Sequence, residues 1–223
     1  MIFPPLIFLF MLFFFLALLI LLPLLMVGVI GQAFLRLGIS PSLVFWLLMF
    51  TLLGSLVNLP IYRYQTQEVM RDQVISYFGM RTRVPQVVRR RETVLAINVG
   101  GALIPLLISL YLIYKMEFGL GLPILVAAVT GVTYKLARPV KGLGIAVPGF
   151  IPPLVAVLGA YLLCPAYLRA PCAYIASTLG IIIGADLLHL NEIGQLGAPV
   201  ASIGGAGTFD AIFIGGIIAV LLS

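Results

Sequence analysis

An all-α, polytopic transmembrane helical bundle of about seven helices is the fold class that this sequence predicts. Of its 223 residues, 62% are hydrophobic and only 9% are charged, and the mean hydropathy is +1.22. Several apolar runs reach the roughly 18–20 residues that a helix needs to cross a bilayer. They are solid runs without apolar–polar alternation, which argues against a transmembrane β-barrel. We expect one integral membrane domain over residues 1–223, because no polar module is long enough to build a core.

The apolar runs place the helices in order along the chain. They cover approximately residues 5–35, 42–60, 93–114, 120–136, 151–167, 173–190 and 207–222. The first run is long enough to project beyond the bilayer or to bend near Pro23. It lacks a positive n-region and exceeds signal-peptide length, so we expect a retained helix.

Residues 61–92 form the one substantial polar segment between predicted helices. They are rich in arginine, and we expect them to be a basic cytoplasmic segment between the second and third helices. β-Branched and aromatic residues surround Phe78, Gly79 and Met80, which favours a short hairpin within residues 74–88.

The basic residues also set an orientation. Of 13 Lys and Arg residues, ten lie in segments 62–92 and 135–141, whereas Arg36, Lys115 and Arg169 lie on the other side. An excess of Lys and Arg marks cytoplasmic loops. The sequence therefore predicts a multi-pass protein of the cell membrane with a cytoplasmic N-terminus. The net charge of +6 needs no nucleic-acid partner, since no aromatic–basic motif accompanies it.

Two aspartates interrupt the C-terminal apolar runs. Asp186 lies in "LGIIIGADLLHL", about four residues before its predicted helix ends, which is roughly 6 Å from the cytoplasmic edge. Asp210 lies in "SIGGAGTFDAIFIGG", a few residues after the next predicted helix begins. Because these helices are antiparallel, the two carboxylates are expected at the same depth.

An ionisable residue inside a membrane costs at least ~2.5–3.5 kcal/mol on insertion scales and therefore marks a functional site. Two carboxylates held close share a proton, so one activates water while the other donates to a carbonyl. This favours an aspartyl protease with Asp186 and Asp210 as its catalytic pair, acting on a membrane-protein or peptide substrate near the cytoplasmic face. The residues expected to position the pair or bind substrate are Asn98, Pro152, Pro153, His189, Gly205 and Gly207. This mechanism needs no cofactor and no metal site.

Three alternatives stay open. Asp186 and Asp210 are also compatible with hydrated interfacial positions, with Asp210 near a helix N-terminus. The spacing of Asp186, His189 and Glu192 also suits an ion- or solute-coupled transporter that uses the same carboxylates. A non-catalytic membrane assembly protein is the third alternative.

The stretch "GGAGTFDAIF" resembles the Gly-x-Gly-Asp element of intramembrane aspartyl proteases, the class of presenilin, signal peptide peptidase and prepilin peptidase. In that class the second catalytic aspartate comes from another helix, which the resemblance assigns to Asp186. Here Asp210 follows Gly207 two positions later than the motif requires.

The C-terminal half, roughly residues 140–223, resembles a prokaryotic membrane-protein family known as domain of unknown function 1614. The stretches "PGFIPPLVA", "GADLLHL" and "GGAGTFDAIF" carry the resemblance. It implies a bacterial or archaeal origin and brings no established activity.

Cys164 and Cys172 flank the loop between the fifth and sixth predicted helices, on the non-cytoplasmic side. Disulfides persist in that compartment, so a structural bridge is one expectation. Two free thiols buried among helices are the other.

Overall fold

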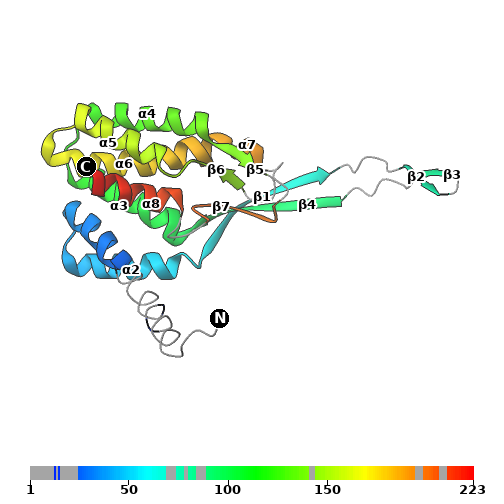
Figure 1. The fold of residues 1–223 in the computed structure, drawn as a ribbon, viewed down its shortest axis with the longest axis horizontal. Helices are drawn as coiled ribbons and strands as arrows, with labels where there is room; N and C mark the ends of the chain where they lie inside the picture. Colours follow the sequence, from blue (N-terminus) through cyan, green and yellow to red (C-terminus); the bar gives the residue numbers. More distant parts are fainter. Residues whose placement is uncertain are drawn as a thin grey trace, which may run out of the picture.

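The computed structural model describes residues 13, 15, 25–68, 74–77, 80–83, 89–140, 144–193, 198–205 and 210–223. It consists mostly of helices packed side by side, with strands gathered at one end (Figure 1). The helices are Leu25–Arg36, α2 (Pro41–Gly54), α3 (Ile104–Lys115), α4 (Gly121–Leu136), α5 (Ile151–Leu163), α6 (Arg169–Ile181), α7 (Leu190–Ile193) and α8 (Ala211–Leu222). The strands are β1 (Asn58–Glu68), β2 (Val74–Tyr77), β3 (Met80–Arg83), β4 (Arg89–Asn98), β5 (Arg138–Val140), β6 (Gly144–Ala146) and β7 (Val200–Ile203).

Helix α6 is the centre of the bundle. It packs against α3, α4, α5 and α8, and nearly all of its residues are buried. Small residues permit the close packing: a Cβ at Gly216 of α8 would lie 2.8 Å from Oγ1 of Thr178. Close helix approach at glycine is typical of helices that pack in membranes. Cys164 and Cys172 are free and buried at the end of this core opposite the strands, so the free-thiol alternative is the one the structure adopts.

The helices differ in length. Within the described residues, one continuous helical stretch, Ala166–Ile193, is long and apolar enough to cross a membrane. It has 28 residues and combines α6 with the turns that follow it. The other six apolar helices are shorter, from 12 residues in Leu25–Arg36 to 17 in Val99–Lys115. At 1.5 Å per residue these span only about 18–26 Å, short of the ~30 Å hydrocarbon layer.

Strands correct the all-α expectation. The second predicted helix, 42–60, ends at Gly54, and residues 58–60 begin β1. Pro60 cannot continue a helix, and it favours an extended backbone at the residue before it. The third predicted helix was placed from residue 93, yet residues up to Asn98 belong to β4. Val94 and Ile97 are β-branched, which favours a strand. A strand that is buried on both faces has a continuous apolar sequence, and this is why the pattern resembled a helix.

The main sheet has the strand order β1-β4-β7. β1 and β4 are antiparallel from Asn58 opposite Asn98 to Glu68 opposite Arg89. β7 pairs with β4 in parallel over Val94–Ile97. β2 and β3 form the short antiparallel pair at the far end of this long hairpin, within the residues where the sequence favours a hairpin (Figure 1). β5 and β6 form a separate antiparallel pair.

All described strands lie at one end of the bundle, because they belong to connections between a helix that runs toward that end and the next helix, which runs back. α2 leads into β1, β4 leads into α3, α4 leads into β5, and β7 leads into α8. Arg36, Lys115 and Arg169 lie at the opposite end of the bundle, because Arg36 and Lys115 end helices that run away from the strands and Arg169 begins α6, which runs toward them. The part of the first predicted helix before residue 25 lies outside the described residues, apart from Phe13 and Phe15.

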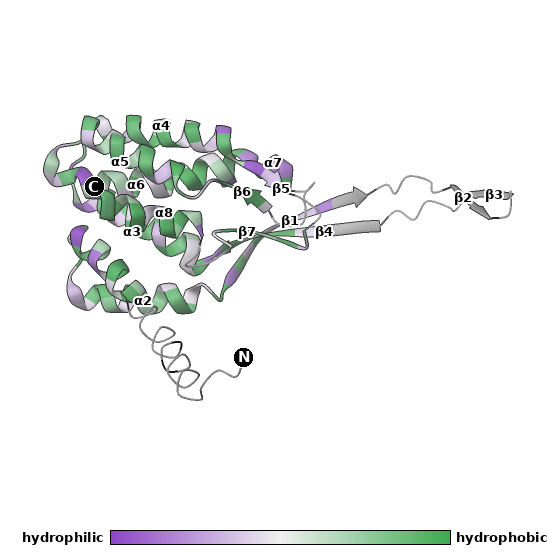
Figure 2. Cartoon of the chain, in the orientation of Figure 1, coloured by the Kyte–Doolittle hydropathy of each residue, from purple (hydrophilic) through white to green (hydrophobic). Residues whose placement is uncertain are grey.

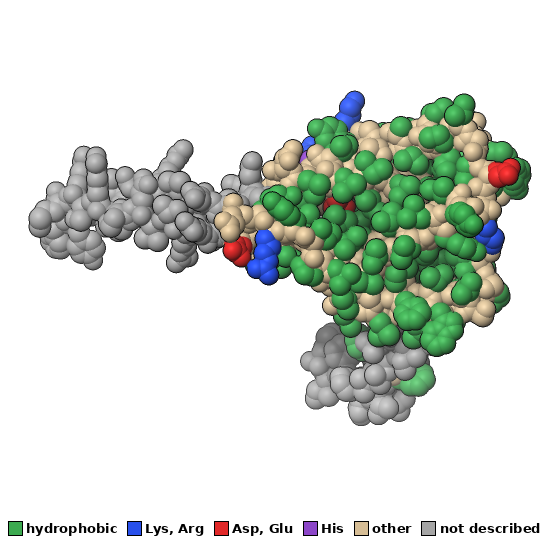
Figure 3. Space-filling view, turned by 180° about the vertical axis from the view of Figure 1, so that it is seen from behind, with side chains coloured by type: hydrophobic (Ala, Val, Ile, Leu, Met, Phe, Trp, Pro, Cys, Tyr) green, Lys and Arg blue, Asp and Glu red, His purple; other side chains and the backbone are tan. Residues whose placement is uncertain are grey.

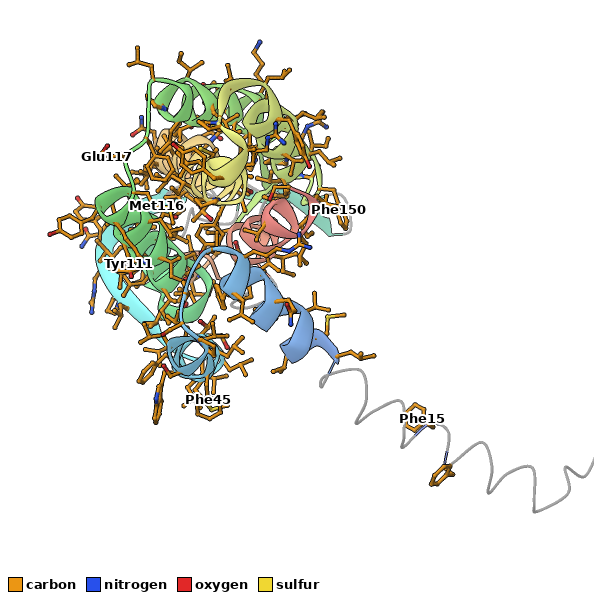
Figure 4. The ribbon with its side chains drawn as sticks, turned by 90° about the vertical axis from the view of Figure 1, so that its left-hand side faces the viewer. Phe15, Phe45, Tyr111, Met116, Glu117 and Phe150 are labelled. Atoms are coloured by element: carbon orange, nitrogen blue, oxygen red, sulfur yellow. The ribbon has the colours of Figure 1, made fainter. Side chains whose placement is uncertain are left out.

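The sides of the helical body are apolar. Hydropathy colouring and the space-filling view show hydrophobic residues covering the helices, with charged side chains toward the two ends (Figures 2 and 3). Phe45, Tyr111 and Phe150 project from different sides when the body is viewed along its helices (Figure 4). Leu162 is 84% exposed and Phe150 is 69% exposed. A surface this apolar on several sides is typical of contact with lipid or protein.

Candidate functional site

Asp186 lies where the long helix changes its winding. After α6 the chain forms a π-helical turn, Ile182–Asp186, and then a 3₁₀ turn, Leu187–His189. Single π-turns inside α-helices are frequent at functional sites. Gly184 lets this turn lie directly on α4, since a Cβ there would be 2.6 Å from the Thr130 carbonyl oxygen. The carboxylate of Asp186 is half-buried on the side facing the main sheet.

Asp210 begins α8. Its backbone is extended, and its Oδ1 accepts a hydrogen bond of 3.0 Å from the N–H of Ile212. Asp210 is therefore the N-cap of this helix, where unpaired N–H groups and the helix dipole favour a negative charge. The expectation that Asp210 lies near a helix N-terminus agrees with this geometry. Capping alone does not explain a second carboxylate nearby.

Asp186 and Asp210 line one cavity of about 570 Å³ and are close enough for their charges to interact. The cavity lies between the main sheet, β6, and the ends of α6 and α8. Its lining comprises Asn58, Leu95, Gly144, Ile145, Val147, Ile181, Ala185, Asp186, Ile193, Val200, Ala201, Ser202, Ile203, Gly204, Gly205, Asp210 and Ala211. A cavity of this size, lined by both polar and apolar groups, is large enough to hold a ligand.

Asn98 supports the cavity wall from behind and does not line it. Its amide nitrogen donates to the carbonyl of Ser55 (2.8 Å) and to Oδ1 of Asn58 (3.1 Å). Its own Oδ1 accepts from the N–H of Gly101 (2.7 Å), which caps the π-helical turn Val99–Leu103. Oδ1 of Asn58 also accepts from the hydroxyl of Ser202 (2.7 Å). Asn98 thus fixes Asn58, which does line the cavity.

His189 faces away from the cavity. Its Nδ1 lies 3.1 Å from the Gly184 carbonyl oxygen and 3.0 Å from that of Ala185, so Nδ1 carries the proton and donates. The centroid of its ring lies 4.9 Å from the centroid of the Tyr134 ring in α4. Because the winding of the helix changes here, Asp186, His189 and Glu192 do not converge. Among the described residues, no three His, Cys, Asp or Glu side chains form a group that could hold a metal.

The remaining predicted residues lie in different places. Pro152 and Pro153 are buried in the first turn of α5, where proline suits a helix start, and they do not line the cavity. Pro153 packs toward Gly215 of α8. Gly205 lines the cavity at the turn after β7. Gly207 lies outside the described residues.

Gly204 lines the cavity and allows a close backbone contact behind it. Its φ of +68° is left-handed, and a Cβ would lie 2.7 Å from the Ala102 nitrogen. Only glycine fits this close approach to the π-helical turn Val99–Leu103. The sequence did not predict Asn58 and Ser202 as cavity residues, because they are 144 positions apart and meet only through the β1-β4-β7 sheet.

The family model described as protein of unknown function DUF1614 matches residues 52–222. This chain belongs to the DUF1614 family. The match confirms the resemblance seen in residues 140–223 and extends it toward the N-terminus. It contains every residue of the cavity, from Asn58 to Ala211, so the DUF1614 segment holds the complete candidate site. No curated protein and no solved structure matches the chain.

Proposed function

We propose that this DUF1614 protein is an intramembrane aspartyl protease with Asp186 and Asp210 as its catalytic pair. The observation that carries the proposal is that two carboxylates from separate helices open into one cavity. A pair of this kind hydrolyses a peptide bond by general acid–base catalysis. Neither the DUF1614 match nor any named relative supplies this activity.

The geometry suggests different roles for the two carboxylates. Asp210 accepts a backbone hydrogen bond at a helix N-terminus, which stabilises its ionised form, so it is the base that takes a proton from water. Asp186 lies beside the apolar Ile181, Ala185 and Ile193 of the cavity wall. In a pair that shares one proton, Asp186 holds it and donates it to the carbonyl oxygen of the substrate.

The proposal includes a multi-pass arrangement in the cell membrane with the strands on the cytoplasmic side. It is supported by the apolar sides of the bundle, by the ten-to-three division of basic residues and by the alternating directions of the helices. The short helices would cross the bilayer only where it thins around the protein. The partners are then the lipid bilayer and a membrane-protein or peptide substrate.

Accessibility of introduced cysteines tests this orientation. In a Cys164→Ala/Cys172→Ala background, cysteines replace Tyr62, which is 58% exposed, or Tyr167, which is 80% exposed. A membrane-impermeant maleimide added outside intact cells should label position 167 and not position 62. Labelling of position 62 from outside would reject the orientation.

Cleavage of fluorogenic peptides by the protein in lipid nanodiscs tests the catalytic pair. Asp186→Asn and Asp210→Asn should each lower kcat by about 10²–10⁴-fold, the range typical of general acid–base groups. Asp210→Asn keeps an oxygen to cap α8, so its thermal unfolding should match wild type, whereas Asp210→Ala should lose about 1 kcal/mol. Loss of cleavage in a normally stable Asp210→Asn protein separates catalysis from capping.

Glu192→Gln is the matched control. Glu192 lies six residues after Asp186 on the same helical stretch but does not line the cavity, so its removal should leave cleavage intact. Cleavage that survives in both aspartate variants would reject the proposal. Ion-dependent uptake into liposomes without cleavage would assign the carboxylates to transport instead.

A further inference from the structure

The strand that borders the cavity is an edge strand. In the order β1-β4-β7, β7 is the last strand, and none of the other described strands pairs with its second edge. All four residues of β7, Val200–Ile203, line the cavity that holds Asp186 and Asp210. An unpaired strand edge is a template for another extended chain.

The register shows which backbone groups of β7 face this edge. The carbonyl of Pro199 accepts a hydrogen bond from the N–H of Val94 in β4 (3.0 Å). Since the N–H and C=O groups of a strand alternate in direction, those of Ala201 and Ile203 also face β4. Those of Val200 and Ser202 face the opposite way.

Part of this outward edge is already used. The carbonyl of Ser202 accepts from the N–H of Gly205 (3.0 Å), which closes the turn after β7. The Val200 N–H, the Val200 C=O and the Ser202 N–H then form a donor–acceptor–donor series two residues long. An extended chain about 4.8 Å away would match it with its own backbone.

We propose that an extended peptide segment binds as an added strand on the outer edge of β7, beside Asp186 and Asp210. This rests on the proposed protease function and specifies its substrate as a peptide in strand conformation. Pairing with a strand edge supplies affinity through the main chain, while pockets select alternate side chains. Leu95, Ile145 and Val147 in the cavity lining provide apolar surfaces for such side chains.

Extended binding also suits the chemistry. A peptide bond within a helix has its carbonyl hydrogen-bonded inside the helix, so water and a carboxylate do not reach it freely. An added strand holds its peptide groups in a fixed row and directs alternate carbonyls away from β7. This presents one of them to the two aspartates in a reproducible position.

A proline at position 200 tests the inference. Val200→Pro removes the outward N–H and places the ring Cδ on the edge, while the hydrogen bonds to β4 stay, because residue 200 does not donate to β4. Proline is tolerated on edge strands at such positions, so the fold should survive. Val200 is 50% exposed, and the control Val200→Ala keeps the N–H.

The probe is a fluorescein-labelled, valine-rich decapeptide, with a fluorophore–quencher version for cleavage. Val200→Pro should raise the KM or Kd about tenfold above the value for Val200→Ala, with little difference in kcat between the two variants, because only the proline variant lacks the N–H. In Asp186→Asn/Asp210→Asn protein, bound peptide should slow amide hydrogen exchange at Val200 and Ser202. Equal values for the proline and alanine variants, or exchange unchanged by peptide, would overturn the inference.

The two proposals fail in different ways. If wild type does not cleave but the decapeptide binds and protects Val200 and Ser202, the edge-strand site stands and the protease activity is rejected. If wild type cleaves but Val200→Pro behaves like Val200→Ala, the protease stands and the edge-strand site is rejected. Absence of peptide binding in every variant rejects the edge-strand site.

Discussion

Replacing Gly184 by alanine should destabilise the bundle next to the candidate site. A Cβ at this position would lie 2.6 Å from the carbonyl oxygen of Thr130, 2.9 Å from Cβ of Thr133 and 3.1 Å from the backbone nitrogen of Tyr134. All three atoms belong to α4, and two of them are main-chain atoms that cannot rotate away. The new methyl group is accommodated only if the π-helical turn and α4 move apart.

The magnitude follows from the overlap. Non-bonded heavy atoms pack at about 3.5–4.0 Å, so the helices must separate by roughly 0.5–1 Å. Overpacking of this kind costs about 1–3 kcal/mol, which lowers the Tm of a domain this size by roughly 2–12 °C. Asp186 is two residues away, and a 1 Å displacement of a reacting group costs up to about 10²-fold in rate. Both stability and cleavage should therefore fall.

Thermal unfolding in nanodiscs, followed by circular dichroism, measures the first effect, and peptide cleavage measures the second. Gly131→Ala is the control, because Gly131 lies in α4 but is exposed and faces away from this contact. A Cβ at Gly131 meets nothing within 4 Å, so this variant should gain about 0.5–1 kcal/mol from better helix propensity. A Gly184→Ala protein as stable as wild type, or an equal loss in both variants, would refute the close packing of α4 on the π-helical turn.

Three further predictions concern residues around the core and the cavity. Asn98→Ala should cost about 2–4 kcal/mol in an SDS unfolding titration, because it removes both the cap at Gly101 and the donor to the Ser55 carbonyl. A loss below about 1 kcal/mol would contradict this. His189→Phe should lower stability by about 1 kcal/mol through the lost Nδ1 hydrogen bond but leave cleavage near wild type, since the ring faces α4; abolished cleavage in a folded protein would contradict that orientation. Cys164 and Cys172 should both react with maleimide in denatured, unreduced protein, whereas Cys172, 1% exposed, should react slowly when folded; protection that ends only on reduction would indicate a disulfide.

Much of the helical arrangement could be predicted from the sequence because apolar runs and charge asymmetry are local signals. The fourth predicted helix, 120–136, agrees with α4 to within one residue. The segment favoured as a hairpin corresponds to β2 and β3. That Asp186 and Asp210 fall at the same end of the bundle follows from the alternating helix directions, which the apolar runs already imply.

The main sheet could not be predicted in the same way. β7 has four residues, and its partner β4 is more than a hundred positions away, so no local pattern identifies it. Residues 94–97, Val-Leu-Ala-Ile, are apolar on both faces, a pattern that also fits the start of a helix. The pairing of Asn58 with Ser202 depends on this sheet. Asp210 as an N-cap, by contrast, was readable from an acidic residue placed directly before an apolar run.

The long hairpin has a consequence for how members of the family can vary. Its two strands leave and re-enter the helical body at one pair, Asn58 opposite Asn98, and only residues 94–97 of β4 support β7. An antiparallel ribbon can be shortened or lengthened at its far end by whole residue pairs without shifting the register at its base. The length of this hairpin is therefore independent of the cavity. Natural or engineered chains can exchange the outer portion of this hairpin, and with it whatever that portion contacts, while keeping the same cavity residues at its base.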